Sequence, residues 1–321
     1  MIQVRTVTVS RIKDEALDIR SYELIDPQGA PLPPFSAGAH IDLHLADKWV
    51  RSYSLCNDPQ ERHRYLITVL RESAGRGGSV FVHEKLAEGS RVPISEPQNN
   101  FPLLHKAKHH TLIAGGIGIT PLLSMARHLE ATGGSYKLYY CASNPMRTAF
   151  RNVLAAPPFN RRTTMHFNFG DPHGRLDVAS LLRRQMEGQH VYCCGPSSLI
   201  EAVRVATQAW CAGTVHFERF KVDPKSATDP ALNSSFEIEI ASTGQVLIAP
   251  ADKSILQVLR ENGISHTSSC EEGICGTCAT GLLSGRAEHR DSVLTEEEKT
   301  AHTVLMVCCS RAATKRLKLD L

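Results

Sequence analysis

Three cysteines lie within nine residues near the end of the chain, and their spacing limits what this segment can fold into. They are Cys270, Cys275 and Cys278, and Cys308 follows after a gap of 29 residues. A C-x4-C-x2-C run with a distant fourth cysteine is the ligand spacing of one class of [2Fe–2S] cluster. Two tetrahedral irons need four converging thiolates, and small residues such as Gly273 let backbone N–H groups approach the sulfur atoms. The spacing therefore predicts an iron–sulfur cluster held by these four cysteines.

Two alternatives remain open for these residues, a structural zinc site and unrelated buried thiols. Zinc favours paired C-x2-C knuckles, and this chain has one such pair. Cys309 competes for the fourth ligand position, but Cys308 is favoured because it follows the apolar run Val304–Val307 and gives the expected spacing. The segment from CEEGICGTC to MVCCS resembles plant-type ferredoxins, and this resemblance implies a β-grasp fold for most of the last domain.

Composition limits the remaining possibilities. The chain has 321 residues, 42% hydrophobic and 21% charged, which is enough for two or three domains with buried cores. A net charge of +3 without a concentrated basic face argues against nucleic-acid binding. We expect a cytoplasmic protein without membrane association, because neither a signal peptide nor a run of 18 apolar residues is found. We expect a monomer, because no coiled-coil pattern or long apolar stripe is evident. In a reducing compartment the ten cysteines favour metal binding over disulfides.

Three segments with different patterns of predicted strands and helices indicate a multidomain α+β and α/β protein. Residues 1–103 contain short alternating strands such as His40–Leu45 and Tyr65–Leu70, which is typical of a small antiparallel β-barrel. Residues 104–223 alternate strands and helices, which predicts a parallel sheet with helices on both faces. Residues 224–235 are polar and contain prolines, as a linker does, and residues 236–321 form a small α+β domain. The expected helices of the second segment are Pro121–Ala131, Ala149–Ala155, Asp177–Met186 and Ser197–Trp210.

Two short motifs in the predicted barrel suggest a phosphate-containing ligand. In RSYSL, Arg51 offers a permanent cation, and Arg51 and Tyr53 share one face of a strand. In GRGGS, a glycine-rich turn leads into a predicted helix over Val80–Leu86 with Ser79 as its N-cap, an arrangement that binds anions. Taken singly, each motif can equally be an ordinary barrel strand or a capped loop.

Together and in this order, RSYSLCND, YLITVLRE and GRGGS resemble the flavin domain of the ferredoxin–NADP reductase superfamily. The branch they resemble is the phthalate dioxygenase reductase and vanillate O-demethylase reductase family, in which the flavin is FMN. FAD stays open, because related barrels bind it. The resemblance implies phosphate contacts from Arg51, Ser52, Arg76, Gly77, Gly78 and Ser79, and flavin-ring contacts from Tyr53, Ser54, Thr68, Val69 and Leu70.

The second segment contains two turns that suit a nicotinamide dinucleotide. The strand Thr111–Ala114 runs into a glycine turn and a helix, so that backbone N–H groups face a pyrophosphate. A later strand ends in Cys-Gly-Pro, and the resemblance implies that Cys194 lies beside the nicotinamide. It also implies that an acidic residue two positions before the terminal aromatic residue closes over the flavin. That aromatic residue is Phe220, which is expected to cover the flavin ring. The candidate residues are Gly115, Gly116, Ile117, Gly118, Thr120, Cys194, Gly195, Pro196 and Phe220, of which Cys194, Phe220 and Thr120 are the catalytic candidates.

The choice between NADH and NADPH depends on what meets the adenosine ribose after the second strand. This chain has Ala142-Ser143-Asn144-Pro145-Met146-Arg147 there, with no acidic residue. Ser143 and Arg147 could accept a 2′-phosphate, but both residue types are common on surfaces. The family resemblance implies NADH.

The ordered set of flavin, nicotinamide and iron–sulfur segments predicts a reductase that splits the electron pair of NADH and passes single electrons to an oxygenase. The reduction potential of a plant-type cluster is near −400 mV and that of a Rieske centre is above about −150 mV. Electron transfer to a Rieske oxygenase of aromatic catabolism is therefore energetically favourable. Alternatives are a reductase for a haem monooxygenase, a quinone or a dye, and a non-enzymatic redox sensor. Glu271 and Glu272, beside the cluster in an acidic third domain, are hypothesised to steer the partner.

Overall fold

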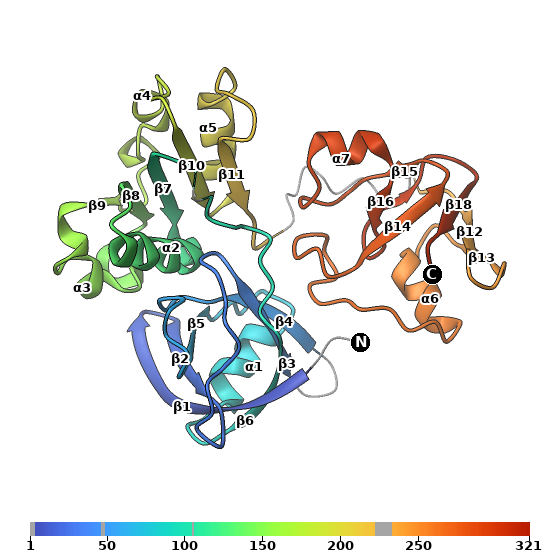
Figure 1. Cartoon of the computed structure of the whole chain (residues 1–321), viewed down its shortest axis with the longest axis horizontal. Coiled ribbons are helices and arrows are strands. Elements are labelled where there is room, and N and C mark those ends of the chain that lie inside the picture. The colour runs from blue at the N-terminus through green and yellow to red at the C-terminus, as the bar shows by residue number, and fades with distance from the viewer. Residues whose placement is uncertain (1–3, 46–48, 105, 222–232) are drawn as a thin grey trace. The chain divides into compact units, whose positions relative to one another are not determined.

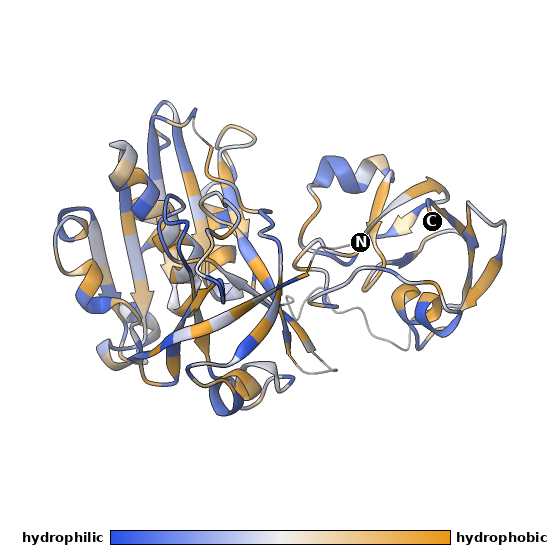
Figure 2. Ribbon diagram, turned by 60° about the horizontal axis from the view of Figure 1, so that its bottom comes forward, coloured by the Kyte–Doolittle hydropathy of each residue, from blue (hydrophilic) through white to orange (hydrophobic). Residues whose placement is uncertain are grey.

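The computed structural model describes residues 4–45, 49–104, 106–221 and 233–321. The chain separates into two compact units, residues 2–219 and residues 220–321 (Figure 1). Three main sheets account for most of the fold, and apolar stretches lie along their strands (Figure 2). The domain boundaries predicted at residues 103 and 223 stay predictions, and residues 224–232 of the predicted linker lie outside the described residues.

The first sheet is an antiparallel barrel of six strands in the order β4-β3-β6-β1-β2-β5. Its interior is apolar because alternate residues point inward, as Ile41, Leu43 and Leu45 do. An isolated bridge between Leu55 and Ile67 joins the two edge strands, so the sheet closes on itself. The strands are β1 (Val4–Ala16), β2 (Ile19–Ile25), β3 (His40–Leu45), β4 (Trp49–Ser54), β5 (Tyr65–Leu70) and β6 (Arg91–Ser95).

The helix α1 (Gly78–Lys85) packs against the barrel and contributes Val82 to its core. The N-cap of α1 is Gly77, whose φ of 83° is left-handed and suits a residue without a side chain. The prediction that Ser79 caps this helix is wrong. The Ser79 hydroxyl lies inside the first turn and accepts a hydrogen bond from the Glu72 amide at 3.1 Å.

The second sheet has five parallel strands in the order β11-β10-β7-β8-β9, as the sequence predicts for residues 104–223. The order reverses between β7 and β10, and open α/β sheets bind ligands at the carboxyl ends of the strands at such a point. The elements are β7 (His109–Gly115), α2 (Ile119–Thr132), β8 (Tyr136–Ala142), α3 (Arg151–Leu154), β9 (Thr163–Phe167), α4 (Val178–Leu181), β10 (Gln189–Cys194), α5 (Ser197–Ala206) and β11 (Val215–Glu218).

Three helices end earlier than the sequence predicts. The helix expected over Asp177–Met186 is α4, which ends at Leu181 because side chains take the groups that the next turn would use. The Trp210 indole donates to the Leu182 carbonyl at 3.2 Å, and the Gln189 side chain accepts from the Met186 amide at 2.9 Å. The helix expected over Ser197–Trp210 is α5, which ends at Ala206, and α3 is likewise shorter than expected.

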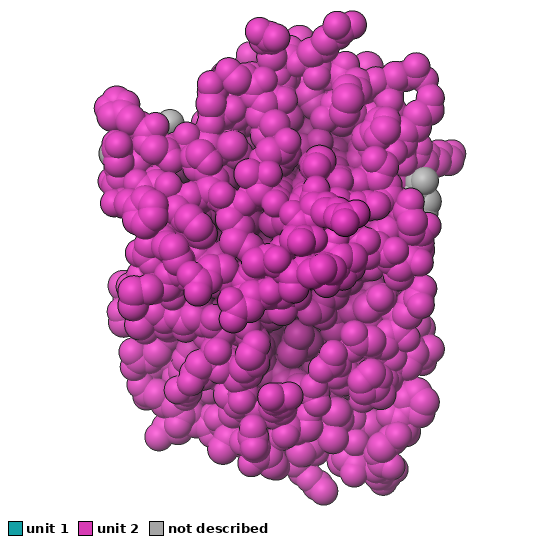
Figure 3. Space-filling view, turned by 90° about the vertical axis from the view of Figure 1, so that its left-hand side faces the viewer, with its two compact units in different colours: residues 1, 220–321 teal, residues 2–219 magenta. Residues whose placement is uncertain are grey.

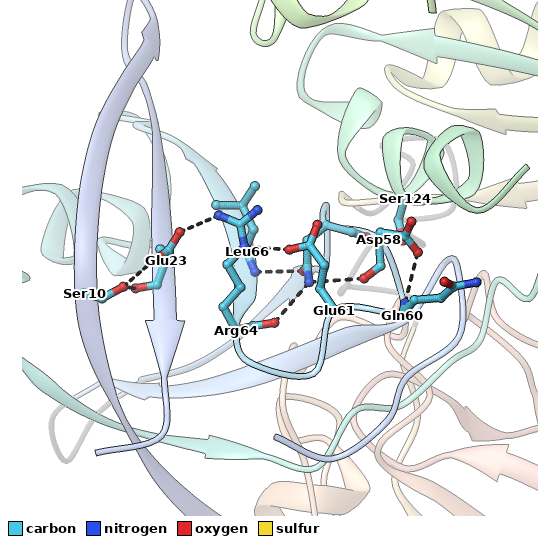
Figure 4. Close-up of polar contacts among 9 residues, drawn as sticks. Ser10, Glu23, Asp58, Gln60, Glu61, Arg64, Leu66 and Ser124 are labelled. Atoms are coloured by element: carbon cyan, nitrogen blue, oxygen red, sulfur yellow. Dashed lines mark hydrogen bonds and ion pairs between the residues drawn. The ribbon is translucent and has the colours of Figure 1, made fainter. Parts of the chain in front are cut away.

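Polar contacts connect the loop after β4 to helix α2 of the parallel-sheet domain within the first unit. Ser124 of α2 donates to the carbonyl of Asn57 at 3.0 Å. On the barrel side of this loop, Arg64 pairs with Glu61 at 2.6 Å and with Glu23 at 2.5 Å (Figure 4). The barrel and the parallel sheet therefore belong to one unit, one face of which is shown in Figure 3.

The second unit contains a mixed five-stranded sheet in the order β13-β12-β18-β14-β16, with β12 and β18 parallel and the other pairs antiparallel. The helix α6 (Ile255–Glu261) packs on this sheet through buried residues, and Ser254 and Gln257 form its capping box. This is the predicted β-grasp architecture. The strands are β12 (Phe236–Ile240), β13 (Val246–Ala249), β14 (Ala279–Ser284), β16 (Val304–Met306) and β18 (Arg316–Leu319), with the short pair β15 (Ala287–Glu288) and β17 (Arg311–Ala312) and the hydrophilic helix α7 (Glu296–Ala301).

Candidate functional site

The barrel brings the two predicted phosphate motifs together. Arg51 of β4 lies over the N-terminus of α1, and its guanidinium donates to the carbonyl of Arg76 at 3.4 Å. A Cβ atom added to Gly78 would lie 2.7 Å from Arg51 Nε, so a glycine is needed for the arginine to pack there. A permanent cation beside the free N–H groups of a helix N-terminus suits a phosphate. This arrangement fits the phosphate of a flavin mononucleotide.

The predicted flavin-ring residues divide between two faces of the barrel wall. Tyr53 is partly buried and packs against the barrel core. Val69 lies in that core, so its side chain is turned away from the outer face on which Leu70 lines a cavity. Thr68 is buried, and its hydroxyl accepts from the thiol of Cys56 at 3.6 Å.

Ser52 and Ser54 have different partners. The Ser52 hydroxyl donates to the buried carboxylate of Asp42 at 2.6 Å, which the sequence analysis did not foresee. Ser54 is buried and hydrogen-bonds Glu218 at the end of β11. Ser52 is thus held by the barrel wall, whereas Ser54 reaches the nucleotide-binding sheet.

The two predicted dinucleotide turns pack directly against each other at the reversal of strand order. A Cβ on Gly118 would collide with the carbonyl of Cys194, and a Cβ on Gly115 would lie 2.6 Å from the Pro196 ring. Glycine is therefore required in the first turn by its contact with the second. The two turns meet where an α/β sheet binds a dinucleotide.

A cavity of about 400 Å³ opens beside these turns. It lies over the carboxyl ends of the parallel strands, and the barrel contributes Leu17, Ile19 and Leu70 to its wall. Gly115, Gly116, Ile117 and Pro196 also line it, which places four of the predicted dinucleotide residues on its surface. Its size and its mostly apolar wall with a few polar groups suit a nucleotide.

Two catalytic candidates lie elsewhere. Thr120 is buried and is not among the residues that line the cavity. Its hydroxyl donates to the Ile117 carbonyl at 3.1 Å and so stabilises the turn. Phe220 is partly exposed and falls in the second compact unit, directly after its boundary with the first. Its predicted position over the flavin stays a prediction.

Cys194 and Glu218 are opposite each other on the neighbouring strands β10 and β11. The Cys194 thiol is 3.9 Å from Glu218 Oε2, and burial raises the pKa of this carboxyl to about 8. Burial also raises the pKa of the Cys194 thiol well above its ordinary value, so the thiol stays protonated. Cys193, the next residue, points to the opposite side and packs in the apolar core. Ser54, Cys194 and Glu218 thus form a neutral, hydrogen-bonding cluster at neutral pH.

The pKa of Glu218 predicts a pH dependence of stability. Because the folded-state pKa is raised above the ordinary carboxyl value, its contribution is complete below that value and is lost as the pH rises to about 8. Glu218→Gln, which stays neutral, should therefore gain roughly 1–2 kcal/mol relative to the parent protein between pH 5 and pH 8.5, a figure reduced for the partial exposure of the residue. Urea unfolding across this range measures the difference.

Glu201→Gln is the control for this prediction, because Glu201 is exposed and paired with Arg204 on α5. Its stability difference from the parent should not vary with pH as that of Glu218→Gln does. A constant difference between Glu218→Gln and the parent at every pH would show that the carboxyl titrates normally.

The four predicted cluster cysteines are all buried in the second unit and form two pairs. The sulfur atoms of Cys278 and Cys308 are 3.1 Å apart. The thiol of Cys270 hydrogen-bonds that of Cys275. Each iron of a [2Fe–2S] cluster bound by four cysteines takes two thiolates, whereas one zinc ion would need all four around a single point. The pairing fits a binuclear cluster.

The loop that carries three of these cysteines turns its backbone toward sulfur. The amides of Glu272 and Ile274 each lie 3.4 Å from Cys270 Sγ. This curvature uses left-handed φ angles of 57° at Glu271, 70° at Gly273 and 76° at Gly276. N–H groups aimed at the ligand sulfur atoms stabilise negative charge there and tune a bound cluster.

Cys309 is placed differently from its neighbour. It is partly exposed, and its sulfur lies 3.8 Å from the Met306 carbonyl. A Cβ on Gly273 would collide with this sulfur, so Cys309 packs behind the cluster loop. The geometry favours Cys308 as the member of the ligand set.

The acidic residues beside the cluster are only partly available to a partner. Glu271 is exposed, but it pairs with Arg260 of α6 at 2.7 Å. Arg260 also donates to Ser268, which ties the helix to the cluster loop. The hypothesis that Glu271 and Glu272 steer a partner stays untested, and the structure gives Glu271 a local role as well.

Comparisons with known proteins agree with this assembly. Residues 238–313 match the 2Fe-2S iron-sulfur cluster binding domain. Phthalate dioxygenase reductase of Burkholderia cepacia is 48% identical over 95% of this chain and 94% of its own. Vanillate O-demethylase oxidoreductase of Pseudomonas putida is 45% identical over 99% of this chain and 100% of its own.

Solved structures of two kinds also match nearly the whole chain. One is phthalate dioxygenase reductase, described as a modular structure for electron transfer from pyridine nucleotides to [2Fe–2S], with a TM-score of 0.76 and 46% identity over 99% of this chain and 98% of that one. The other is an intact type IV self-sufficient cytochrome P450 monooxygenase, with a TM-score of 0.89 and 38% identity over 99% of this chain and 41% of that one.

A flavin barrel, a dinucleotide-binding sheet and a [2Fe–2S] domain in one chain define an iron–sulfur flavoprotein oxidoreductase that uses reduced nicotinamide. Identity of this level over almost the full length then fixes the family. The chain belongs to the phthalate dioxygenase reductase family. The cofactors predicted from the sequence, FMN, a [2Fe–2S] cluster and NADH, are those of this family, and the predicted fold class is confirmed. No helix in the described part of the chain has the length and apolar character needed to cross a membrane.

Proposed function

We propose that this chain is the monomeric reductase component of a Rieske-type oxygenase system that acts on an aromatic substrate. The observation that supports this best is the pairing of four buried cysteines in a chain that also holds the flavin and dinucleotide sites. Two relatives are named phthalate 4,5-dioxygenase oxygenase reductase subunit and vanillate O-demethylase oxidoreductase, and others are named for tert-butanol and carnitine monooxygenases. A plant-type cluster has a reduction potential near −400 mV, and that of a Rieske centre is roughly 250 mV or more higher. The equilibrium constant for electron transfer from the cluster to the Rieske centre is therefore about 10⁴ in favour of transfer.

When bound, FMN would supply hydride chemistry with NADH and the cluster would supply one-electron transfer. The chain's own residues bind and orient these groups. Arg51 and the N-terminus of α1 hold the flavin phosphate, with Tyr53 and the Ser54–Cys194–Glu218 cluster at the ring. The turns at Gly115 and Cys194 hold the nicotinamide nucleotide against it, which is a problem of positioning. Neutral Cys194 and Glu218 place no negative charge where hydride arrives.

The residues proposed for each group follow the sequence predictions, with side-chain directions taken from the structure. The cluster ligands are Cys270, Cys275, Cys278 and Cys308. The flavin site comprises Arg51, Ser52, Tyr53, Ser54, Thr68, Val69, Leu70, Arg76, Gly77, Gly78, Ser79 and Phe220. The nicotinamide site comprises Gly115, Gly116, Ile117, Gly118, Thr120, Cys194, Gly195 and Pro196. Ser52, Val69 and Thr120 would contribute backbone atoms, because their side chains are held elsewhere in the fold.

An anaerobic NADH titration of the purified protein tests the electron path. Loss of flavin absorbance together with a rhombic reduced-[2Fe–2S] signal in electron spin resonance is the expected result. Loss of flavin absorbance without that signal would reduce the assignment to a simple flavin reductase. Addition of a purified oxidised Rieske oxygenase should then remove the signal within seconds, and its persistence would contradict the proposed partner.

A second candidate is a reductase for a haem monooxygenase. It is favoured by the structural match to a self-sufficient cytochrome P450, of which the matched part is 41% of that chain. Mixing the reduced protein separately with a Rieske oxygenase and with a ferric P450 under carbon monoxide distinguishes the two, because each acceptor has its own absorbance change.

A further inference from the structure

NADH and NADPH differ by one phosphate on the adenosine ribose, and an α/β sheet distinguishes them just after its second strand. An acidic side chain there binds the ribose hydroxyl of NADH, whereas an arginine accommodates the 2′-phosphate of NADPH. The second strand of this sheet is β8, which ends at Ala142. The exposed residue that follows is Ser143, which lines the cavity and has no charge.

The wall of the cavity at the ends of β8 and β9 is basic. Arg147 and Arg175 line it, together with the neutral polar residue Asn168. Both arginines are exposed. Among the described residues that line the cavity, none is Asp or Glu. This is the opposite of the charge pattern that selects an unphosphorylated ribose.

Of three carboxylates near this region, two make local hydrogen bonds and the third, Asp18, pairs with Arg147 itself. Asp171 accepts from the amide of His173 at 2.8 Å, and Asp177 accepts from the amide of Ser180 as the N-cap of α4. Asp18 lies 3.7 Å from Arg147, with both side chains 40% or more exposed. An exposed pair at that distance is weak and leaves the planar guanidinium with further donors.

The pyrophosphate end of the cavity fixes which part of a dinucleotide meets these residues. Gly115, Gly116 and Ile117 line the cavity at the end of β7, the central strand, where backbone N–H groups suit a pyrophosphate. The nicotinamide turn at Cys194 lies on the β10 side of that strand. The adenosine must therefore extend to the other side, over β8 and β9, where Ser143, Arg147 and Arg175 are found.

We propose that this chain oxidises NADPH as well as NADH, with Arg147 and Arg175 binding the 2′-phosphate and Ser143 donating a hydrogen bond to it. The proposal rests on the proposed function, because it takes the cavity as the dinucleotide site. The electron balance is the same for both nucleotides: each gives one hydride to the flavin and leaves as NADP⁺ or NAD⁺. The 2′-phosphate changes binding and takes no part in the chemistry.

The test is steady-state reduction of ferricyanide by each nucleotide, which needs neither the cluster nor a partner. For the parent protein, kcat/KM with NADPH should be at least one tenth of that with NADH. Arg147→Gln and Arg175→Gln should each lower the NADPH-to-NADH ratio of kcat/KM about tenfold, since each removes a charge-assisted contact. Ser143→Asp should lower the ratio further, because it places a carboxylate against the phosphate.

The matched control is Arg183→Gln, an exposed arginine that removes the same charge outside the cavity lining and should leave the ratio unchanged. Binding is tested separately by inhibition with 2′,5′-ADP and 5′-AMP, and only the former should weaken in the Arg147 and Arg175 variants. A parent ratio below one tenth, or a ratio that these substitutions leave unchanged, overturns the proposal. Loss of activity with NADH itself would instead contradict the proposed function.

Discussion

Cys308→Ser should remove the reduced-cluster signal, whereas Cys309→Ser should keep it. The two residues are adjacent and both carry thiols, so the pair tests ligand position with little change in composition. Cys308 is buried with its sulfur 3.1 Å from that of Cys278, while Cys309 is partly exposed behind Gly273. Serine is a poor substitute for a thiolate on iron, because soft sulfur ligands are what these clusters select.

The measurement combines electron spin resonance with two acceptors. Cytochrome c reduction, which takes electrons one at a time through the cluster, should fall more than about a hundredfold in Cys308→Ser, on the order of 3 kcal/mol in barrier. Ferricyanide reduction by NADH should continue, because the flavin can supply it directly. That second activity shows that the variant has folded around its flavin.

The opposite pattern would assign the fourth ligand to Cys309. Loss of the signal in both variants would mean that Cys309 supports the cluster through the packing of the cluster loop. A retained signal in both would contradict a four-cysteine cluster built from this segment.

The cysteine ligands of the cluster could be predicted from the sequence because three of them lie close together and all four have a fixed spacing. Three cysteines in one loop specify most of the site, and the strand before Cys308 supplies the fourth ligand. What the sequence did not contain was the left-handed backbone at Glu271, a non-glycine residue, which turns the amides toward sulfur. The ion pair of Glu271 with Arg260 also depends on folding, since the helix and the loop meet only in space.

The strands that the sequence named were predictable to within a residue or two, but several helix ends were not. The strand over His40–Leu45 has the predicted bounds because an apolar alternation defines it locally. The end of α4 depends on Trp210 and Gln189, which come from later parts of the chain and take the groups that a further turn would use. No local pattern near Leu181 records those contacts.

The glycine turn beside the cavity shows the same limit more clearly. Its glycines were identified from the motif, yet the contact of Gly118 with Cys194 that requires glycine joins residues 76 positions apart. Glu218 was expected only as the acidic residue two positions before Phe220, and its place opposite Cys194 and beside Ser54 of the barrel follows from the fold. Arg175 was missed, because its place on the cavity wall follows from a loop after β9 that has no motif.

Arg51→Gln should weaken FMN binding about a hundredfold. The guanidinium lies over the N-terminus of α1, where two charge-assisted hydrogen bonds to a phosphate would contribute roughly 3 kcal/mol. Glutamine keeps much of the length of the side chain and removes the charge. Titration of the flavin-free protein with FMN, followed by flavin fluorescence, gives the dissociation constant.

Gly78→Ala tests the same site without changing its charge. The added Cβ would lie 2.7 Å from Arg51 Nε, so the arginine must move away from the helix N-terminus. We expect a loss of FMN affinity in the same direction as for Arg51→Gln and, in the double variant, little further loss, because the two changes remove one interaction. Additive losses would mean that Gly78 and Arg51 contact the flavin independently.

Arg71→Gln is the matched control, since Arg71 is exposed and pairs with Glu84 on the far end of α1. It removes the same charge from the same part of the barrel and should leave FMN affinity within about twofold. Equal losses in Arg51→Gln and Arg71→Gln would indicate that the net charge of the barrel attracts the phosphate. A loss confined to Arg51→Gln and Gly78→Ala would instead require a specific contact, because a diffuse field cannot distinguish two arginines of one small barrel.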